Sequence, residues 1–163
     1  MGKIIKNGFD FMRYTNAGLI RKVDDIPVLK NELITLSESK THMEMSKYAV
    51  LLAEHILDIS GTERCAEIET CLIVNTKWQN KEATFQDARS VAGVMNDFAR
   101  EEKDSVKVKV FQAMAQVAAT PHVRWHALAA SEYAVVIMNL MYQKNLDKVR
   151  EEREWQIGLM NSV

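Results

Sequence analysis

The fold is decided by residues 127–141, which read ALAASEYAVVIMNLM. The only polar side chains in this run are Ser131, Glu132 and Asn139, which form one narrow strip on a helix. A helix that is apolar nearly all round is buried among other helices, and its small alanines allow close approach. The run is too short and too polar to span a bilayer, which needs about 20 apolar residues. It therefore predicts the central helix of an all-α bundle.

The residues in front of this run are typical of a helix start. Threonine caps a first turn and proline is tolerated at the first helical position, so Thr120-Pro121 predicts a central helix over 121–143. On such a helix His122 and His126 are i and i+4, and they would lie on the same side.

Helices are also expected along the first part of the chain. Pro27 favours a helix start, and leucines follow it at helical spacing to about Ser37. The sequence Thr-His-Met-Glu at 41–44 matches a capping box, and Gly61 is typical of a helix end. The next helix is therefore predicted over 41–60.

The remaining helices follow from similar signals. Thr62 and Thr84 are expected to cap helices over about 63–79 and 84–102. The Val-Lys-Val-Lys-Val run that follows alternates like a strand, but the helix-forming residues after it favour a helix. Two more helices are predicted, over 105–119 before the central helix and over 145–160 after it.

Length and composition agree with one globular domain. The chain has 163 residues, of which 47% are hydrophobic and 26% charged. Six glycines and two prolines are too few for the many turns of a β-sandwich or barrel. We expect a single-domain bundle of about seven helices, with residues 41–163 as the bundle domain. Residues 1–40 are expected to form an N-terminal arm or helical extension, whose first 22 residues suit a short helix or an extended arm.

Charge and cysteine content narrow the class of protein. The net charge of −1 is not that of a nucleic-acid binder or of a chain held on anionic membrane. Residues 44–102 are mildly acidic, which suits a basic partner but is more often a solvated face. Cys65 and Cys71 would point in different directions on a helix, and unpaired cysteines fit a reducing compartment. The N-terminus lacks the apolar core of a signal peptide, so a cytoplasmic protein is expected.

Histidines are the one set of residues that suggests chemistry. His55, His122 and His126 could converge on a metal ion or a polar pocket, with Glu54 or Asp58 as a further ligand or base. The zincin pattern HExxH is absent, because residue 123 is valine. The favoured interpretation is that these are buried histidines with hydrogen-bonded rings. No catalytic residue and no cofactor is predicted.

Aromatic residues offer a different kind of site. Trp78, Trp125 and Trp155 are candidate anchors for a protein partner. Trp125 is the best candidate, because it would point away from the histidine face of the helix. The nine methionines mostly sit in apolar helical faces, which favours core filling over a promiscuous surface.

Three segments carry a resemblance to a known family. Residues 52–57 (LAEHIL), 120–134 (TPHVRWHALAASEYA) and 150–156 (REEREWQ) resemble a bacterial immunity protein family over roughly residues 45–160. The resemblance implies an all-α fold and a role in protecting a bacterium by binding a toxin. The family's recurrent residues, carried onto this chain, are His55, His122, His126, Tyr133 and Trp155.

Two classes of function therefore stay open. One is a non-enzymatic immunity protein whose partner is a cognate toxin. The other is a metal-binding helical protein or metal-dependent enzyme that uses His55, His122 and His126. A small-molecule sensor with a pocket lined by the same residues is a third, weaker hypothesis. A homodimer is compatible with a bundle of this size, but nothing in the sequence favours it specifically.

Overall fold

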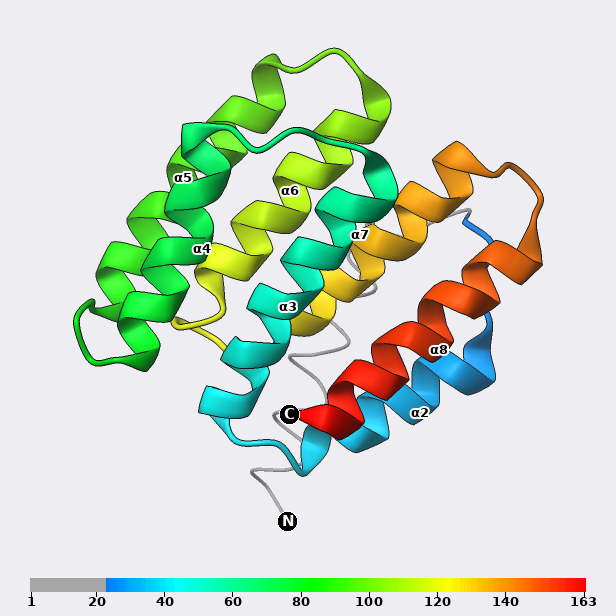
Figure 1. The fold of residues 1–163 in the computed structure, drawn as a ribbon, viewed down its shortest axis with the longest axis horizontal. Coiled ribbons are helices and arrows are strands. Elements are labelled where there is room, and N and C mark those ends of the chain that lie inside the picture. Colours follow the sequence, from blue (N-terminus) through cyan, green and yellow to red (C-terminus); the bar gives the residue numbers. More distant parts are fainter. Residues whose placement is uncertain (1–22) are drawn as a thin grey trace.

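Seven α-helices make up residues 23–163, the part of the chain that the computed structural model describes, and no strand occurs there. The expectation for residues 1–22 lies outside these described residues, and the domain boundary at residue 40 stays a prediction. The predicted all-α, single-domain fold is confirmed. The helices are α2 (Pro27–Glu38), α3 (His42–Ser60), α4 (Ala66–Gln79), α5 (Phe85–Glu101), α6 (Ser105–Ala119), α7 (His126–Met141) and α8 (Leu146–Ser162) (Figure 1).

Two capping boxes start helices where the sequence predicts them. The Thr41 hydroxyl accepts the Glu44 N–H at 3.1 Å, and the Glu44 carboxylate accepts the Thr41 N–H at 2.7 Å. Thr84 and Asp87 repeat this reciprocal pair at the start of α5. At the end of α3, Gly61 has a φ of 65°, the left-handed conformation that glycine adopts without steric cost. The bounds of α3 and α5 are thus set by local chemistry.

Helix α4 starts later than its predicted first residue at 63. The hydroxyl of Thr62 accepts a hydrogen bond from Ser60 at 2.9 Å instead of capping a helix. Arg64 extends the connection by pairing with Glu54 of α3 and with Glu69 of α4. These contacts hold residues 62–65 as a loop, and Cys65 takes the cap position without a side-chain hydrogen bond.

The central helix is buried as predicted, but it begins at His126 and not at Pro121. Every residue of α7 from His126 to Met138 is buried. Thr120 ends α6 instead of starting α7, because its hydroxyl donates to the Gln116 carbonyl at 3.0 Å and its own backbone is helical. The expected span of 121–143 is therefore wrong at both ends.

The start of α3 holds the connection between α6 and α7 in place. The His42 ring contacts the Thr120 carbonyl at 2.7 Å through Nε2, and Arg124 donates to the Lys40 carbonyl. These contacts come from residues some 80 positions away, which local sequence signals do not contain. The chain consequently makes a turn at 120–125 before α7 starts.

The helices surround α7 in a simple arrangement. Helix α7 packs against α6, α3 and α8, while α4 and α5 cover the outer side of α6. Helix α2 lies beside α8 at the opposite end of the molecule (Figure 1). The joint between α2, α3, α7 and α8 is where most of the buried charge is found.

Candidate functional site

Arg153 of α8 is the centre of a buried ionic cluster. Its side chain is 0% exposed. The guanidinium donates to both carboxylate oxygens of Asp25, at 3.0 and 2.7 Å, and to Glu132 of α7 at 2.9 Å. Burial alone would lower the pKa of Arg153, but the hydrogen bonds and negative charge of Asp25 and Glu132 outweigh it and raise the pKa above its usual range. The arginine is therefore held in its charged form.

The same contacts attach α2 to the bundle. Burial would raise the pKa of Asp25, but the hydrogen bonds from Arg153 lower it overall. Lys30 of α2 adds a second positive charge, 3.6 Å from Glu132. Removing α2 would leave the buried pair of Arg153 and Glu132 without these counter-charges, so the helix is tied to α7 and α8 by charge as well as by packing.

Gln156 lies one helical turn after Arg153 on α8 and extends the cluster of hydrogen bonds. It accepts a hydrogen bond from Arg153 at 3.0 Å and donates to Oε1 of Glu152 at 2.8 Å. The other oxygen of Glu152 contacts Nε2 of His55 at 2.7 Å. Because a carboxylate only accepts, the imidazole N–H donates here. We call Asp25, Glu132, Arg153, Gln156, Glu152 and His55 the Arg153 network.

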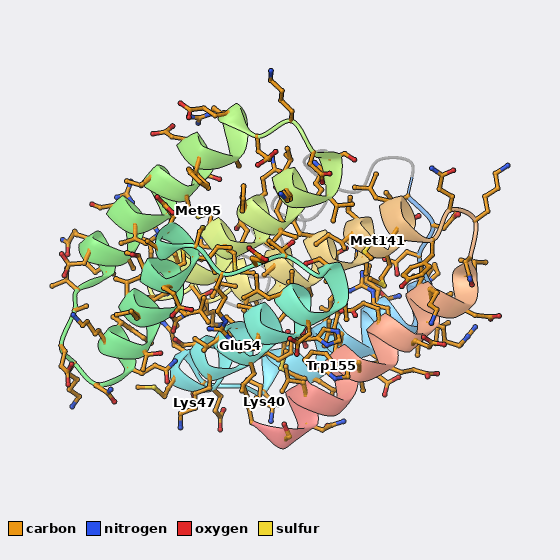
Figure 2. All side chains as sticks on the ribbon, turned by 45° about the horizontal axis from the view of Figure 1, so that its top comes forward. Lys40, Lys47, Glu54, Met95, Met141 and Trp155 are labelled. Atoms are coloured by element: carbon orange, nitrogen blue, oxygen red, sulfur yellow. The ribbon has the colours of Figure 1, made fainter. Side chains whose placement is uncertain are left out.

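His55 joins this network to an aromatic stack. Its ring lies parallel to the indole of Trp155, with centroids 3.5 Å apart and planes 9° apart. The imidazole is therefore fixed at its edge by Glu152 and at its face by Trp155. The indole is 37% exposed, so the stack opens onto the surface beside α3 (Figure 2).

Ser131 completes the link between α3, α7 and α8. The Tyr48 hydroxyl lies 2.7 Å from Ser131 Oγ, which itself donates to the Ala127 carbonyl. Burial is the main cause that raises the pKa of Tyr48 above its usual range. The Ser131 carbonyl accepts from Gln156 at 3.1 Å. The three sequence segments that carried the family resemblance thus meet in one buried site.

Sequence reasoning named only the aromatic and histidine residues of this site. It missed Asp25, Glu132, Glu152, Arg153 and Gln156. A signal was present for one of them: Glu132 is a lone carboxylate on an apolar helix, and a buried carboxylate needs a cationic partner. Arg153 is that partner, but nothing local in the sequence selects it over other arginines.

His122 and His126 lie at another joint, between α5, α6 and α7. Their ring centroids are 6.5 Å apart, although only His126 is on the helix. Nδ1 of His126 contacts the Gln116 side chain at 2.6 Å, and His122 lies against Phe85 at 5.6 Å. Burial, together with the neighbouring His122, lowers the pKa of His126 to about 4. His126 is therefore neutral at physiological pH.

The three histidines do not converge on a metal site. Within residues 23–163 no group of three His, Cys, Asp or Glu side chains is placed to hold a metal ion. His55 contacts α8, whereas His122 and His126 contact α5 and α6. Of the two proposed further ligands, Glu54 pairs with Arg64.

The two other predicted site residues pack inside the bundle. Trp125 is 7% exposed, and the guanidinium of Arg124 lies 4.0 Å from its ring centroid. Tyr133 is buried, and Lys109 lies over its ring at 5.8 Å. Burial raises the pKa of Tyr133 to about 12. Of the tryptophans, Trp155 is the one that the structure leaves exposed.

The fold and this site define an all-α bundle whose helices are joined by a buried ionic network. The chain belongs to the family described as Imm-5 like putative immunity protein, which matches residues 35–163. The family predicted from the three segments is thereby confirmed. Comparison with curated proteins and with solved structures gave no match. None of the helices in the described part is long and apolar enough to cross a membrane.

Proposed function

We propose that this chain is a non-enzymatic immunity protein that binds and neutralises a bacterial toxin. The observation that carries the proposal is its membership of an immunity protein family over residues 35–163. Family membership supports a protein partner, and the toxin is the partner that an immunity role requires.

The geometry supports binding by a preformed surface. The Arg153 network fixes α2, α3, α7 and α8 relative to one another through buried hydrogen bonds. A rigid surface loses little conformational entropy when it binds, so more of the contact energy is retained as affinity. In this proposal the histidines are structural: His55 and His126 each direct a ring nitrogen to an internal partner.

The free thiols of Cys65 and Cys71 suit a reducing compartment. We accordingly place the encounter with the toxin in the cytoplasm of the producing cell. One chain would cover one toxin molecule, and a homodimer is the alternative assembly.

Co-expression with the toxin encoded by the neighbouring gene tests the proposal. The expected result is that the chain restores growth of the host and co-elutes with the purified toxin as a complex. Light scattering of the chain alone and of the complex gives the stoichiometry. If the toxin stays lethal and the two purified proteins do not associate at micromolar concentration, the proposal is wrong.

A further inference from the structure

We propose that the open face of Trp155 is the anchor of the toxin-binding surface, and that it receives an arginine side chain of the partner. This inference rests on the proposed immunity function and names the surface and the chemistry of the contact. It follows from the stacking, the exposure and the unpaired charge around this one residue.

One face of the Trp155 indole is covered by another side chain of the protein. His55 covers one face of the ring at 3.5 Å, and Glu152 fixes His55 in turn. In residues 23–163 no cation or second ring occupies the opposite face of Trp155. Exposed tryptophans that are fixed before binding are typical of interface hot spots, since little side-chain entropy is lost on association.

Other aromatic rings of this chain are covered by a cationic side chain, whereas Trp155 is not. Trp125 is covered by the guanidinium of Arg124 at 4.0 Å, and the exposed Tyr142 has Lys148 over its ring at 5.4 Å. Trp155, like the exposed Phe85, has no such cation within the described residues, and it is the one of the two whose ring is stacked in parallel on a histidine. A guanidinium stacks well on an indole face.

The charges beside the ring favour the same ligand. Glu154 is the neighbour of Trp155 on α8, and Asp58 lies one turn beyond His55 on α3. Both carboxylates are exposed and make no ion pair within the described residues. Gly158, one turn after Trp155, leaves open space, because a Cβ there would meet nothing within 4 Å. These unpaired carboxylates on the two helices that carry the His55–Trp155 stack favour a cationic group on the partner.

Apolar surface continues from the stack along α3. Leu51 lies one turn before His55 and is 46% exposed. It lines a groove of about 480 Å³ between α3, α4 and the end of α8, together with Val50 and Val163. Figure 2 shows Trp155 on α8 beside α3, on the side of the molecule where Lys47 and Glu54 also lie. The other lining residues of this groove are polar and include Glu44 and Lys47, so the surface combines an aromatic anchor with a groove of mixed character, as protein interfaces do.

Binding of purified variants to the neighbouring-gene toxin, measured by surface plasmon resonance, tests the inference. Trp155→Ala is expected to raise Kd by about 30-fold or more. Glu154→Lys leaves the core untouched and is expected to raise Kd about 10-fold, mainly through a slower association rate, with a smaller effect at high salt. The matched controls are Tyr142→Ala, an equally exposed aromatic, and Glu101→Lys on α5, and both are expected to stay within about threefold of the parent.

Three other results of these binding measurements would lead to different conclusions about the anchor and the immunity function. If the parent chain binds the toxin and Trp155→Ala binds equally well, the anchor is wrong and the immunity function stands. If the parent chain neither binds nor protects, the proposed function fails and the anchor fails with it. If the parent chain is a dimer that Trp155→Ala converts to a monomer, the surface joins two copies of this chain and the inference is overturned. Circular dichroism of each variant ensures that only folded protein is compared.

Discussion

The guanidinium of Arg153 lies 2.9 Å from the carboxylate of Glu132, and both side chains are buried between α7 and α8. Asp25, just before α2, and Lys30 of α2 bring a second pair of opposite charges to the same place. A buried charge that is paired and hydrogen-bonded is tolerated, but one left without its partner is strongly destabilising. This joint is therefore where a single substitution should cost the most stability.

Replacing Arg153 with methionine tests that joint. Arg153→Met keeps much of the side-chain volume but removes the guanidinium that hydrogen-bonds to both Asp25 and Glu132 and leaves only Lys30 near them, so we expect the free energy of unfolding to fall by about 3–5 kcal/mol. Urea denaturation followed by circular dichroism measures the loss. Arg150→Met, an exposed arginine on the same helix, should change stability by no more than about 0.5 kcal/mol. Equal effects of the two substitutions would contradict the network.

Protonation of His126 should make the fold less stable in mild acid. Its pKa is lowered to about 4 in the folded chain, so an unfolded chain with the ordinary value of 6.5 binds the proton first as pH falls. Stability is then complete above about pH 6.5 and decreases towards pH 4. Between pH 7 and pH 5 we expect a loss of about 2 kcal/mol from this group.

Urea denaturation at pH 7 and at pH 5 measures that loss. The His126→Gln variant provides the control, because its side chain can still donate to Gln116 but does not titrate. The difference in stability between the two pH values should shrink by about 2 kcal/mol in this variant. An unchanged difference would show that another group causes the acid sensitivity.

A second buried polar group, Asn75, links α3, α4 and α6. It donates to the Val117 carbonyl at 2.9 Å, accepts from Gln79 at 3.0 Å, and also contacts the Ser46 hydroxyl. Asn75→Ala would leave the Val117 carbonyl with only the Thr120 N–H at 3.3 Å and would remove the acceptor of the buried Ser46 hydroxyl, so we expect a cost of about 2–3 kcal/mol. Asn80→Ala, at an exposed position after the end of α4, is the comparison and should cost about 0.5 kcal/mol or less. The two unfolding curves should separate clearly if Asn75 holds the three helices together.

Thr41 and Thr62 are both predicted from the sequence to cap a helix, but replacing them with alanine should reduce stability by different amounts. Thr41→Ala removes the hydroxyl that caps α3 and should cost about 1 kcal/mol. Thr62→Ala removes a hydroxyl that bonds only to Ser60 in a loop, so its cost should stay below about 0.5 kcal/mol. Thermal unfolding of both variants, scanned side by side, provides the check. A larger loss at Thr62 would mean that α4 starts earlier than in this structure.

The positions of most helices, and the identity of the central one, could be predicted from the amino-acid sequence. The signals for these helices are local: the spacing of apolar residues, the capping boxes at Thr41 and Thr84, and the αL glycine Gly61. Each acts within one or two helical turns, so each can be recognised in the sequence. The apolar run at 127–141 placed α7 in the core for the same local reason.

The start of α7 and the pairing of the buried charges depend on how the helices pack in three dimensions. The turn at 120–125 depends on His42 and Lys40, and the partner of Glu132 depends on how α2 and α8 pack on α7. The histidines show the same dependence on packing. Their residue type suggested one shared site, but in the folded chain His55 contacts Glu152 and His126 contacts Gln116. Helix signals are local, whereas the pairing of buried polar groups is set by the relative orientation of whole helices, which a single sequence does not specify.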